Sequence, residues 1–359
     1  TIFSSGSDRM HVIGRRALKN LIVHNKEFTY LLEHSIARCY LADMGKVLES
    51  YYEVVTQVVL EHPDYPMPFW KLLGVGLYTL GSEQSEMRSK SAHMLRILEE
   101  RQQKSSKIQD YDISISDKTK AVYKLAQFEI SKRLSKQHSE LAFIIFSEFT
   151  AYFNQLQSGA QRNMVAAILP WIQIIELQID PNGGPTAQSY VLLTNLFEIT
   201  IKSSSALHNE VQALWQALAT GPHAGNVQLV LDFIMSLCLD RREQNFVEYA
   251  KQIVVFLSST PAGVKVVEFL LMQITPKAMI PNEKRELSPP PPDVGKLPYI
   301  AELAEALPIG AKQAGFSLGQ LSLILLVDLM VSPVQLVAEN VPLLLQVVTV
   351  LWDHYIPLV

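Results

Sequence analysis

Residues 246–274 read FVEYAKQIVVFLSSTPAGVKVVEFLLMQI, and this stretch decides the fold. Apolar residues recur every three or four positions on both sides of Thr260-Pro261, as in helices that bury one face each. A hydroxyl residue followed by proline is a frequent helix start, so the second helix is expected to begin there. The stretch therefore predicts a helix pair. Its apolar faces are Phe246, Ala250, Ile253 and Leu257, then Val264, Val267, Leu271 and Ile274.

The same pattern continues along the chain, for example at Leu207, Val211, Leu214 and Leu218. Turn signals separate such stretches at intervals of about twenty residues, and no segment shows a sustained two-residue alternation. The chain is therefore expected to be all-α. A helix pair in about forty residues is the period of HEAT and armadillo repeats, which predicts an α-solenoid of about fourteen or fifteen helices. A globular helical bundle is the alternative, although bundles use fewer and longer helices.

Two segments interrupt the pattern, the polar Lys104–Asp117 and the longer Thr275–Leu297. The second contains four consecutive prolines, which favour an extended, solvated chain. We interpret it as a spacer, with a docking role for a proline-binding module or phosphorylation at Ser288 as the alternative. The expected organisation is helical repeats over 1–275, a Pro-rich inter-repeat loop over 276–297, and further apolar helical repeats over 298–359.

Two prolines fall inside helical patterns rather than between them. Pro170 follows Leu169 and Pro342 follows Val341. Each removes a main-chain donor, so each is expected to kink or split its helix.

Composition excludes several classes of protein. The 359 residues are 48% apolar and carry a net charge of −4, an ordinary globular balance. The apolar stretches are shorter than the roughly 20 residues of a membrane helix, so a soluble protein is expected. Cys39 and Cys238 are far apart and form no CxxC motif, which fits buried thiols in a reducing compartment. The chain starts at Thr1 without methionine and stops in an apolar run, so it is expected to be part of a longer protein.

One motif imitates a hydrolase. Residues 315–319 read GFSLG and match the GxSxG nucleophile elbow, which requires a strand before the serine. The preceding residues contain glycine and proline and no β-rich run, whereas an apolar helical pattern follows. We therefore expect Ser317 and Gln320 to form a capping box at that helix start. The alternative is a serine hydrolase that uses Ser317 with the downstream Asp328 and His354.

Metal and cofactor motifs are missing from the sequence. The nine histidines are scattered, with no HExxH and none near a cysteine, and no phosphate-binding glycine motif is present. Asp180–Pro185 reads as a turn between helices. The sequence therefore predicts no metal site, no cofactor and no catalytic residue.

Charge is concentrated in one segment. Between Arg101 and Lys136 there are nine basic residues and four acidic ones, a net charge of +5. Such a stripe is a candidate surface for an acidic or phosphorylated partner, or for an anionic membrane, although a plain solvated helix face has the same composition. Nucleic acid is not expected because the stripe has no interleaved aromatic platform of the kind that single-stranded nucleic acid prefers. The candidate partner-binding stripe is Lys118, Lys120, Lys124, Lys132, Arg133 and Lys136.

The C-terminal part of the chain has few charges, because only six of the sixty-three residues from Leu297 to Val359 are charged. Helices of this composition are covered on more than one side. Either remaining repeats of the parent protein pack on this end, as we expect, or a partner does.

Several motifs resemble the central region of the Furry-type cell morphogenesis proteins. They are Met164–Ile172 with Ile175-Glu176-Leu177, Leu214–Ala219, Asn226–Ile234 and Tyr249–Leu257, in the order that the family shows, preceded by Arg38-Cys39-Tyr40 and Leu95–Glu99. The likeness covers most of the chain and is firmest between Ser147 and Leu271. Residues 297–359 resemble the fungal branch more closely.

The resemblance implies a large HEAT/armadillo-like scaffold for NDR-class kinases and their Mob co-activators in polarised growth and cell shape. It implies a cytoplasmic location, at the cell cortex or sites of polarised growth. It transfers no active-site residue. His24–Thr29 resembles the basophilic substrate pattern of NDR kinases, although Thr29 is better explained as part of a helix start. An unrelated HEAT-repeat adaptor or transport receptor is the alternative function.

Overall fold

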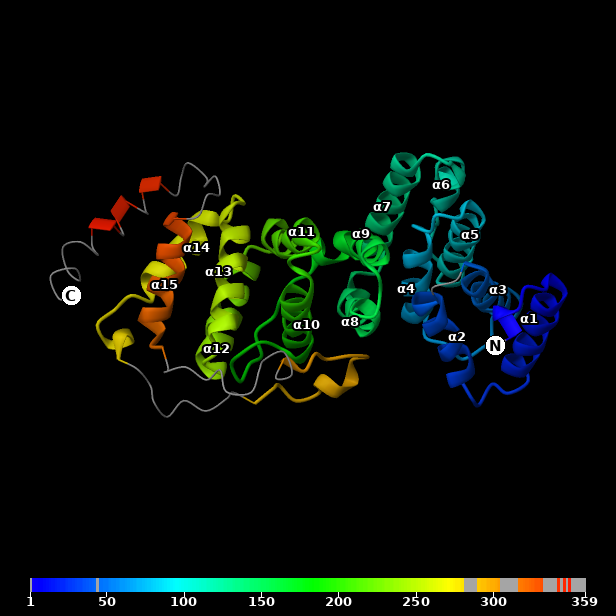
Figure 1. The fold of residues 1–359 in the computed structure, drawn as a ribbon, viewed down its shortest axis with the longest axis horizontal. Coiled ribbons are helices and arrows are strands. Elements are labelled where there is room, and N and C mark those ends of the chain that lie inside the picture. The colour runs from blue at the N-terminus through cyan, green and yellow to red at the C-terminus, as the bar shows by residue number, and fades with distance from the viewer. Residues whose placement is uncertain are drawn as a thin grey trace. The chain divides into compact units, whose positions relative to one another are not determined.

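The chain divides into two compact units, Thr1–Trp171 and Ile172–Val359. The computed structural model describes residues 2–42, 45–280, 289–303 and 316–331, and pairs of residues at 341–342, 345–346 and 348–349. Over these residues the regular elements are helices, apart from an isolated antiparallel bridge between Ile179 and Pro185. The expected all-α class is confirmed (Figure 1).

In the first unit, α1 to α7 contact helices one or two places away along the chain, and α8 packs on α4. Helix α3 contacts α1, α2 and α5, and α4 contacts α2, α5 and α8, so the helices form two layers. This is the packing of an α-solenoid, in which a helix pair buries its apolar face against the neighbouring pair. The helices are α1 (Asp8–Val23), α2 (Tyr30–Leu41), α3 (Gly45–Glu61), α4 (Phe69–Thr79), α5 (Ser85–Arg101), α6 (Asp112–Ser116), α7 (Lys120–Gln137), α8 (Ala142–Phe153) and α9 (Ser158–Ile174).

The second unit repeats this arrangement. Helix α13 contacts α11, α12, α14 and α15, and α12 also contacts α14. Figure 1 shows α12 to α15 stacked beside one another. The helices are α10 (Ala187–Ser203), α11 (His208–Thr220), α12 (Asn226–Arg241), α13 (Gln244–Ser258), α14 (Gly263–Met272) and α15 (Leu318–Val331).

The cores explain why β-branched pairs adopt helical structure. Val54-Val55 lie in α3 and Val254 lies in α13, and all three side chains are buried. Burial of an apolar face outweighs the small intrinsic cost of valine in a helix.

Each unit also buries a tryptophan whose indole N–H donates a hydrogen bond. Trp171 donates to Ser131 Oγ at 3.0 Å, and Trp215 donates to Thr200 Oγ1 at 2.9 Å.

The polar segment 104–117 is more ordered than its composition predicts. It contains a 3-10 turn, Ile108–Tyr111, followed by α6. Ile108 and Ile115 are buried, and the buried Arg88 donates from Nε to the Ile115 carbonyl at 2.6 Å and from Nη2 to the Asp117 carbonyl at 2.6 Å. The segment is therefore packed against α5 through two apolar anchors and one long side chain.

Pro170 does not split its helix, because α9 continues from Ser158 to Ile174. Of the expected kink or split, the split is wrong, and a kink at this position stays a prediction. Ser131 Oγ donates to the Ala167 carbonyl at 2.6 Å, next to the carbonyl that the missing proline N–H leaves without its usual donor. Val341 and Pro342 are helical, whereas most of the residues around them lie outside the described part of the chain.

The two units do not coincide with the sequence-based division at 275 and 297, which stays a prediction. Much of the loop over 276–297 and most of 298–359 lie outside the described residues, as do Ser288 and His354. Among the described residues, no helix is both long and apolar enough to cross a membrane.

Candidate partner-binding site

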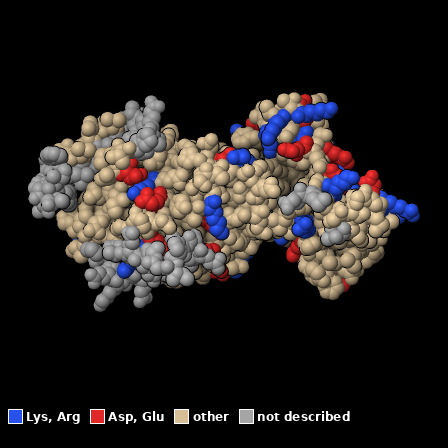
Figure 2. Space-filling view, in the orientation of Figure 1, with Lys and Arg blue, Asp and Glu red and all other residues tan. Residues whose placement is uncertain are grey.

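The basic residues of the predicted stripe lie in and just before α7. The inner face of this helix buries Tyr123, Ile130 and Leu134. The outer face exposes Lys132, Arg133 and Lys136, which we call the α7 basic face. Residues three and four apart share one side of a helix, so these three cations form one patch. Figure 2 shows Lys and Arg side chains gathered over α6 and α7.

Apolar side chains share this outer face. Leu125 is 62% exposed, Val122 is 38% exposed, and both lie at helical spacing from the basic face. The Arg133 guanidinium stands 5.4 Å from the ring centre of Tyr111, a distance at which the ring's negative face attracts a cation. Cations beside exposed apolar residues are complementary to an acidic amphipathic segment of another protein.

Lys118 and Lys120 are exposed at the N-terminal end of α7. Here the free main-chain N–H groups already carry positive partial charge, so two lysines add to an electropositive end. The nearby carboxylate of Asp117 accepts from the Thr119 main-chain N–H at 2.7 Å, and these contacts lower the pKa of Asp117.

Lys124 is different, because its side chain turns inward. Its Nζ donates to Asn163 Oδ1 at 2.6 Å and to Gln127 Oε1 at 3.3 Å. Burial, with Lys120 and Arg88 nearby, lowers the pKa of Lys124 to about 8. The structure therefore brings five of the six residues to the surface and gives Lys124 an internal role.

Ser317 caps a helix, as the sequence predicted. Its Oγ accepts from the Gln320 main-chain N–H at 3.1 Å, and Gln320 Oε1 accepts from the Ser317 main-chain N–H at 2.9 Å. This reciprocal pair is a capping box at the start of α15. Ser317 is 2% exposed, whereas the serine of a nucleophile elbow is presented to solvent at a sharp turn.

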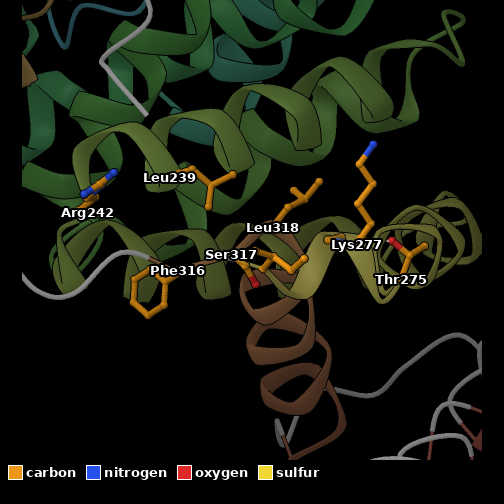
Figure 3. Close-up of a pocket in the computed structure, with 9 residues that line it drawn as sticks. Leu239, Arg242, Thr275, Lys277, Phe316, Ser317 and Leu318 are labelled. Atoms are coloured by element: carbon orange, nitrogen blue, oxygen red, sulfur yellow. Dashed lines mark hydrogen bonds between the residues drawn. The ribbon is translucent and has the colours of Figure 1, made fainter. Parts of the chain in front are cut away.

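A cavity of about 320 Å³ adjoins this cap. Its lining is mainly apolar, with Leu239, Phe316 and Leu318 among the contributors. The two cations in the lining, Arg242 and Lys277, lie at opposite ends of the row of side chains in Figure 3. They do not converge on one point, so the cavity lacks a focused anion site.

The remaining candidate groups have structural positions. Cys39 and Cys238 are buried, and burial raises the pKa of both thiols, that of Cys238 to about 12. Over the described residues no three His, Cys, Asp or Glu side chains gather as a metal site would need. Thr29 is half-buried at the residue before α2, where its carbonyl accepts from Leu32 and Glu33. Its phosphorylation stays a prediction.

Sequence reasoning missed a set of buried asparagines. Asn226 accepts from the Leu177 main-chain N–H at 2.9 Å and donates to the Ile175 carbonyl at 2.7 Å, which fixes the segment after α9 against α12. Asn195 binds main-chain groups in the same way. The half-buried Asn163 donates to the Tyr78 carbonyl, while its Oδ1 accepts from side chains. The available signal was an amide inside an apolar run, because a buried amide must find partners.

Comparison with known proteins identifies the relatives of the chain. The family model described as "Cell morphogenesis central region" matches residues 4–288. Cell morphogenesis protein PAG1 of Saccharomyces cerevisiae is 28% identical over the whole chain, which covers 15% of that protein. Cell polarity protein mor2 of Schizosaccharomyces pombe is 28% identical over 99% of the chain, which covers 16% of it. The chain thus spans less than a fifth of the length of either relative.

Proposed function

The chain belongs to the cell morphogenesis central-region family, and from this premise we propose that it is a non-enzymatic scaffold segment. It organises NDR-class kinase and Mob co-activator signalling in polarised growth and cell morphogenesis. The family match over residues 4–288 carries the proposal. The relatives' names, which refer to cell morphogenesis and cell polarity, support the process but do not mention a kinase.

The mechanism is one of proximity. A helical solenoid that binds a kinase and its co-activator at fixed positions raises the effective concentration of each for the other without chemistry of its own. The capping role of Ser317 and the buried, high-pKa thiols support a non-enzymatic function, because the strongest nucleophile candidates are engaged or inaccessible. The proposed location is the cytoplasm, at the cortex or at sites of polarised growth.

The docking surface that we propose is the α7 basic face, flanked by Lys118, Lys120 and the exposed Leu125. Its partner is an acidic amphipathic segment of the kinase or the co-activator, with apolar residues that cover Leu125 and Val122. Such an interface associates faster at low ionic strength, since the opposite charges steer the encounter.

The test is a pull-down with the purified chain as bait and the NDR-class kinase and Mob proteins as prey. The variant Lys132→Glu/Arg133→Glu/Lys136→Glu reverses the α7 basic face. The matched control, Arg9→Glu/Lys265→Glu/Lys277→Glu, makes the same change in charge at three exposed cations on separate elements. We expect at least a tenfold loss of retained kinase or co-activator for the first variant and little change for the control.

Two results would contradict the proposal in different ways. Failure of the unmodified chain to retain either protein, at low as well as physiological salt, would exclude this segment as the scaffold for them. Equal loss with both triple variants would show a general effect of net charge, and the α7 basic face would then have no specific role.

A further inference from the structure

An extended segment of the chain lies on α10 in the second unit. Residues 297–303, which we call the strap, read LPYIAEL and have no regular secondary structure from Leu297 to Glu302. Ala301 and Leu303 are buried, whereas Pro298 and Glu302 are exposed. Alternate residues of an extended chain point to opposite sides, so one side of the strap faces the protein. In Figure 1 the segment is the orange trace beside one end of α10.

The side chain of Asn195 holds the main chain of the strap at two points. Its Oδ1 accepts from the Ala301 N–H at 2.8 Å, and its Nδ2 donates to the Tyr299 carbonyl at 3.2 Å. Asn195 is fully buried within an apolar part of α10, where an amide is retained only if both of its polar atoms have partners. The amide therefore binds the peptide units on both sides of Ile300, as a neighbouring β-strand would.

A second contact adds side-chain specificity. The Tyr299 hydroxyl lies 2.9 Å and 3.1 Å from the two carboxylate oxygens of Glu198, to which it donates. Glu198 is three residues after Asn195 and so lies on the same side of α10, and it is also paired with Lys202 at 2.7 Å. On α10, Glu198 therefore binds the phenol of Tyr299, and Asn195 binds main-chain groups of the strap.

The family model includes the whole of α10 and ends at residue 288, before the strap begins, whereas the alignments to PAG1 and mor2 extend over 99–100% of the chain. Contacts to main-chain groups do not depend on which residue supplies them, so another extended chain satisfies Asn195 equally well. The strap is held in cis by these hydrogen bonds and by the burial of Ala301 and Leu303, and exchange with a partner requires that it open without unfolding the helices beneath it.

We propose that the surface of α10 formed by Asn195 and Glu198 is a peptide-binding subsite, which the strap occupies in cis. Its ligand is an extended segment of a partner protein with a tyrosine, a small residue two positions later and an apolar residue two positions after that. The partner replaces the strap residue for residue. This goes beyond the scaffold role, because it assigns a binding subsite and a ligand pattern without using the identity of the kinase or the co-activator.

The experiment measures binding of a fluorescently labelled peptide of residues 295–303, GKLPYIAEL, by fluorescence anisotropy. The protein is the full chain, unmodified or with Tyr299→Ala/Ala301→Pro, which removes the phenol and the N–H that hold the strap in cis. We expect the variant to bind the peptide at least tenfold more tightly than the unmodified chain, because the intramolecular competitor has a high effective concentration.

The matched control is the same peptide with the amide nitrogen of the alanine methylated. It lacks the N–H that donates to Asn195 Oδ1, so its affinity for the variant should fall at least tenfold. Absence of peptide binding by a variant that keeps its helical circular dichroism would overturn the proposal, as would equal binding of the methylated peptide.

A second measurement covers the case in which the variant does not fold. Hydrogen exchange of the Ala301 amide is followed in the unmodified chain with and without excess peptide. We expect faster exchange with the peptide, since displacement of the strap exposes this N–H to water. Unchanged protection at saturating peptide would mean that the strap is a fixed part of the fold and would also overturn the proposal.

Discussion

The guanidinium of Arg88 lies 3.8 Å from the ring centre of Tyr123, and both side chains are buried. Arg88 also donates to four main-chain carbonyls, those of Ser82 and Glu83 before α5, that of Ile115 in α6 and that of Asp117 just after α6. One cation therefore joins α5, the segment after it and α7. A planar guanidinium with five donors suits this role, whereas lysine has too few donors and no flat face.

Replacement of Arg88 by methionine should destabilise the first unit by more than about 3 kcal/mol, since buried carbonyls lose their donors and Tyr123 loses its cation. Lysine at this position should restore only part of the loss. Urea unfolding followed by circular dichroism measures the effect. The control is Arg9→Met, at an exposed cation on α1, which should change stability by less than about 0.5 kcal/mol. Equal effects of the two substitutions would contradict this account of Arg88.

Gly81 leaves room for a polar cluster that joins α4, α7 and α9. A Cβ atom at this position would lie 1.8 Å from Asn163 Oδ1 and 2.5 Å from Gln127 Nε2. Gly81→Ala should therefore cost about 1–3 kcal/mol, because the cluster must move apart. The matched control is Gly159→Ala in α9, where no atom lies within 4 Å of the new Cβ. It should be neutral or stabilise by up to about 1 kcal/mol. Thermal unfolding of both variants measures the difference, and a neutral Gly81→Ala would contradict the prediction.

The helical class followed from the sequence because apolar periodicity is a local property. The face Phe246, Ala250, Ile253 and Leu257 is buried in α13 as predicted. The cap at Ser317 is also local, since its partner is three residues away. The order in 104–117 was not predictable, because it depends on Arg88, which lies 27 residues before its partner Ile115 and looks like an ordinary surface residue in the sequence.

The candidate site was predictable in composition but not in orientation. A count of basic residues treats Lys124 and Lys132 alike. They lie eight residues apart, only about 80° around α7 at 100° per residue, so helical spacing alone does not separate them. Lys124 turns inward because Asn163 and Gln127 accept hydrogen bonds from its Nζ. The hydrogen bonds between Asn195 and the strap join residues about a hundred positions apart, and a single sequence contains no signal for such pairs. A buried asparagine within an apolar run shows only that some partner exists.

The lowered pKa of Lys124 predicts that the stability of the folded chain depends on pH. Its pKa in the folded chain is about 8, below the 10.5 of a free lysine, because the charged form is poorly solvated. Between these two values the unfolded chain binds more protons than the folded one, so stability from this group rises with pH from about 8 to 10.5. Below pH 8 both states carry the proton, and the cost of the buried charge is present in full.

The comparison that isolates this effect is between the unmodified chain and Lys124→Gln, with Lys136→Gln at an exposed position as control. The melting temperature at pH 9.5 minus that at pH 7.5 should be more positive for the unmodified chain than for Lys124→Gln. Lys136→Gln should follow the unmodified chain. A Lys124→Gln profile parallel to that of the unmodified chain would show that Lys124 titrates normally.

Substitution of Ser317 tests whether this residue caps a helix or acts as a catalytic nucleophile. Ser317→Ala removes the acceptor for the Gln320 N–H, and loss of such a cap typically costs about 1 kcal/mol. Amides in the first turn of α15 should then exchange faster with solvent. Ser322→Ala on the same helix is the control, because the Ser322 hydroxyl is buried without a hydrogen-bond partner among the described residues, and its removal should be neutral or stabilising. Covalent labelling of the unmodified chain by a serine-directed phosphonate, abolished by Ser317→Ala, is the result that would contradict the cap. We expect no labelling, since the hydroxyl of Ser317 is engaged at the helix start and almost inaccessible to solvent.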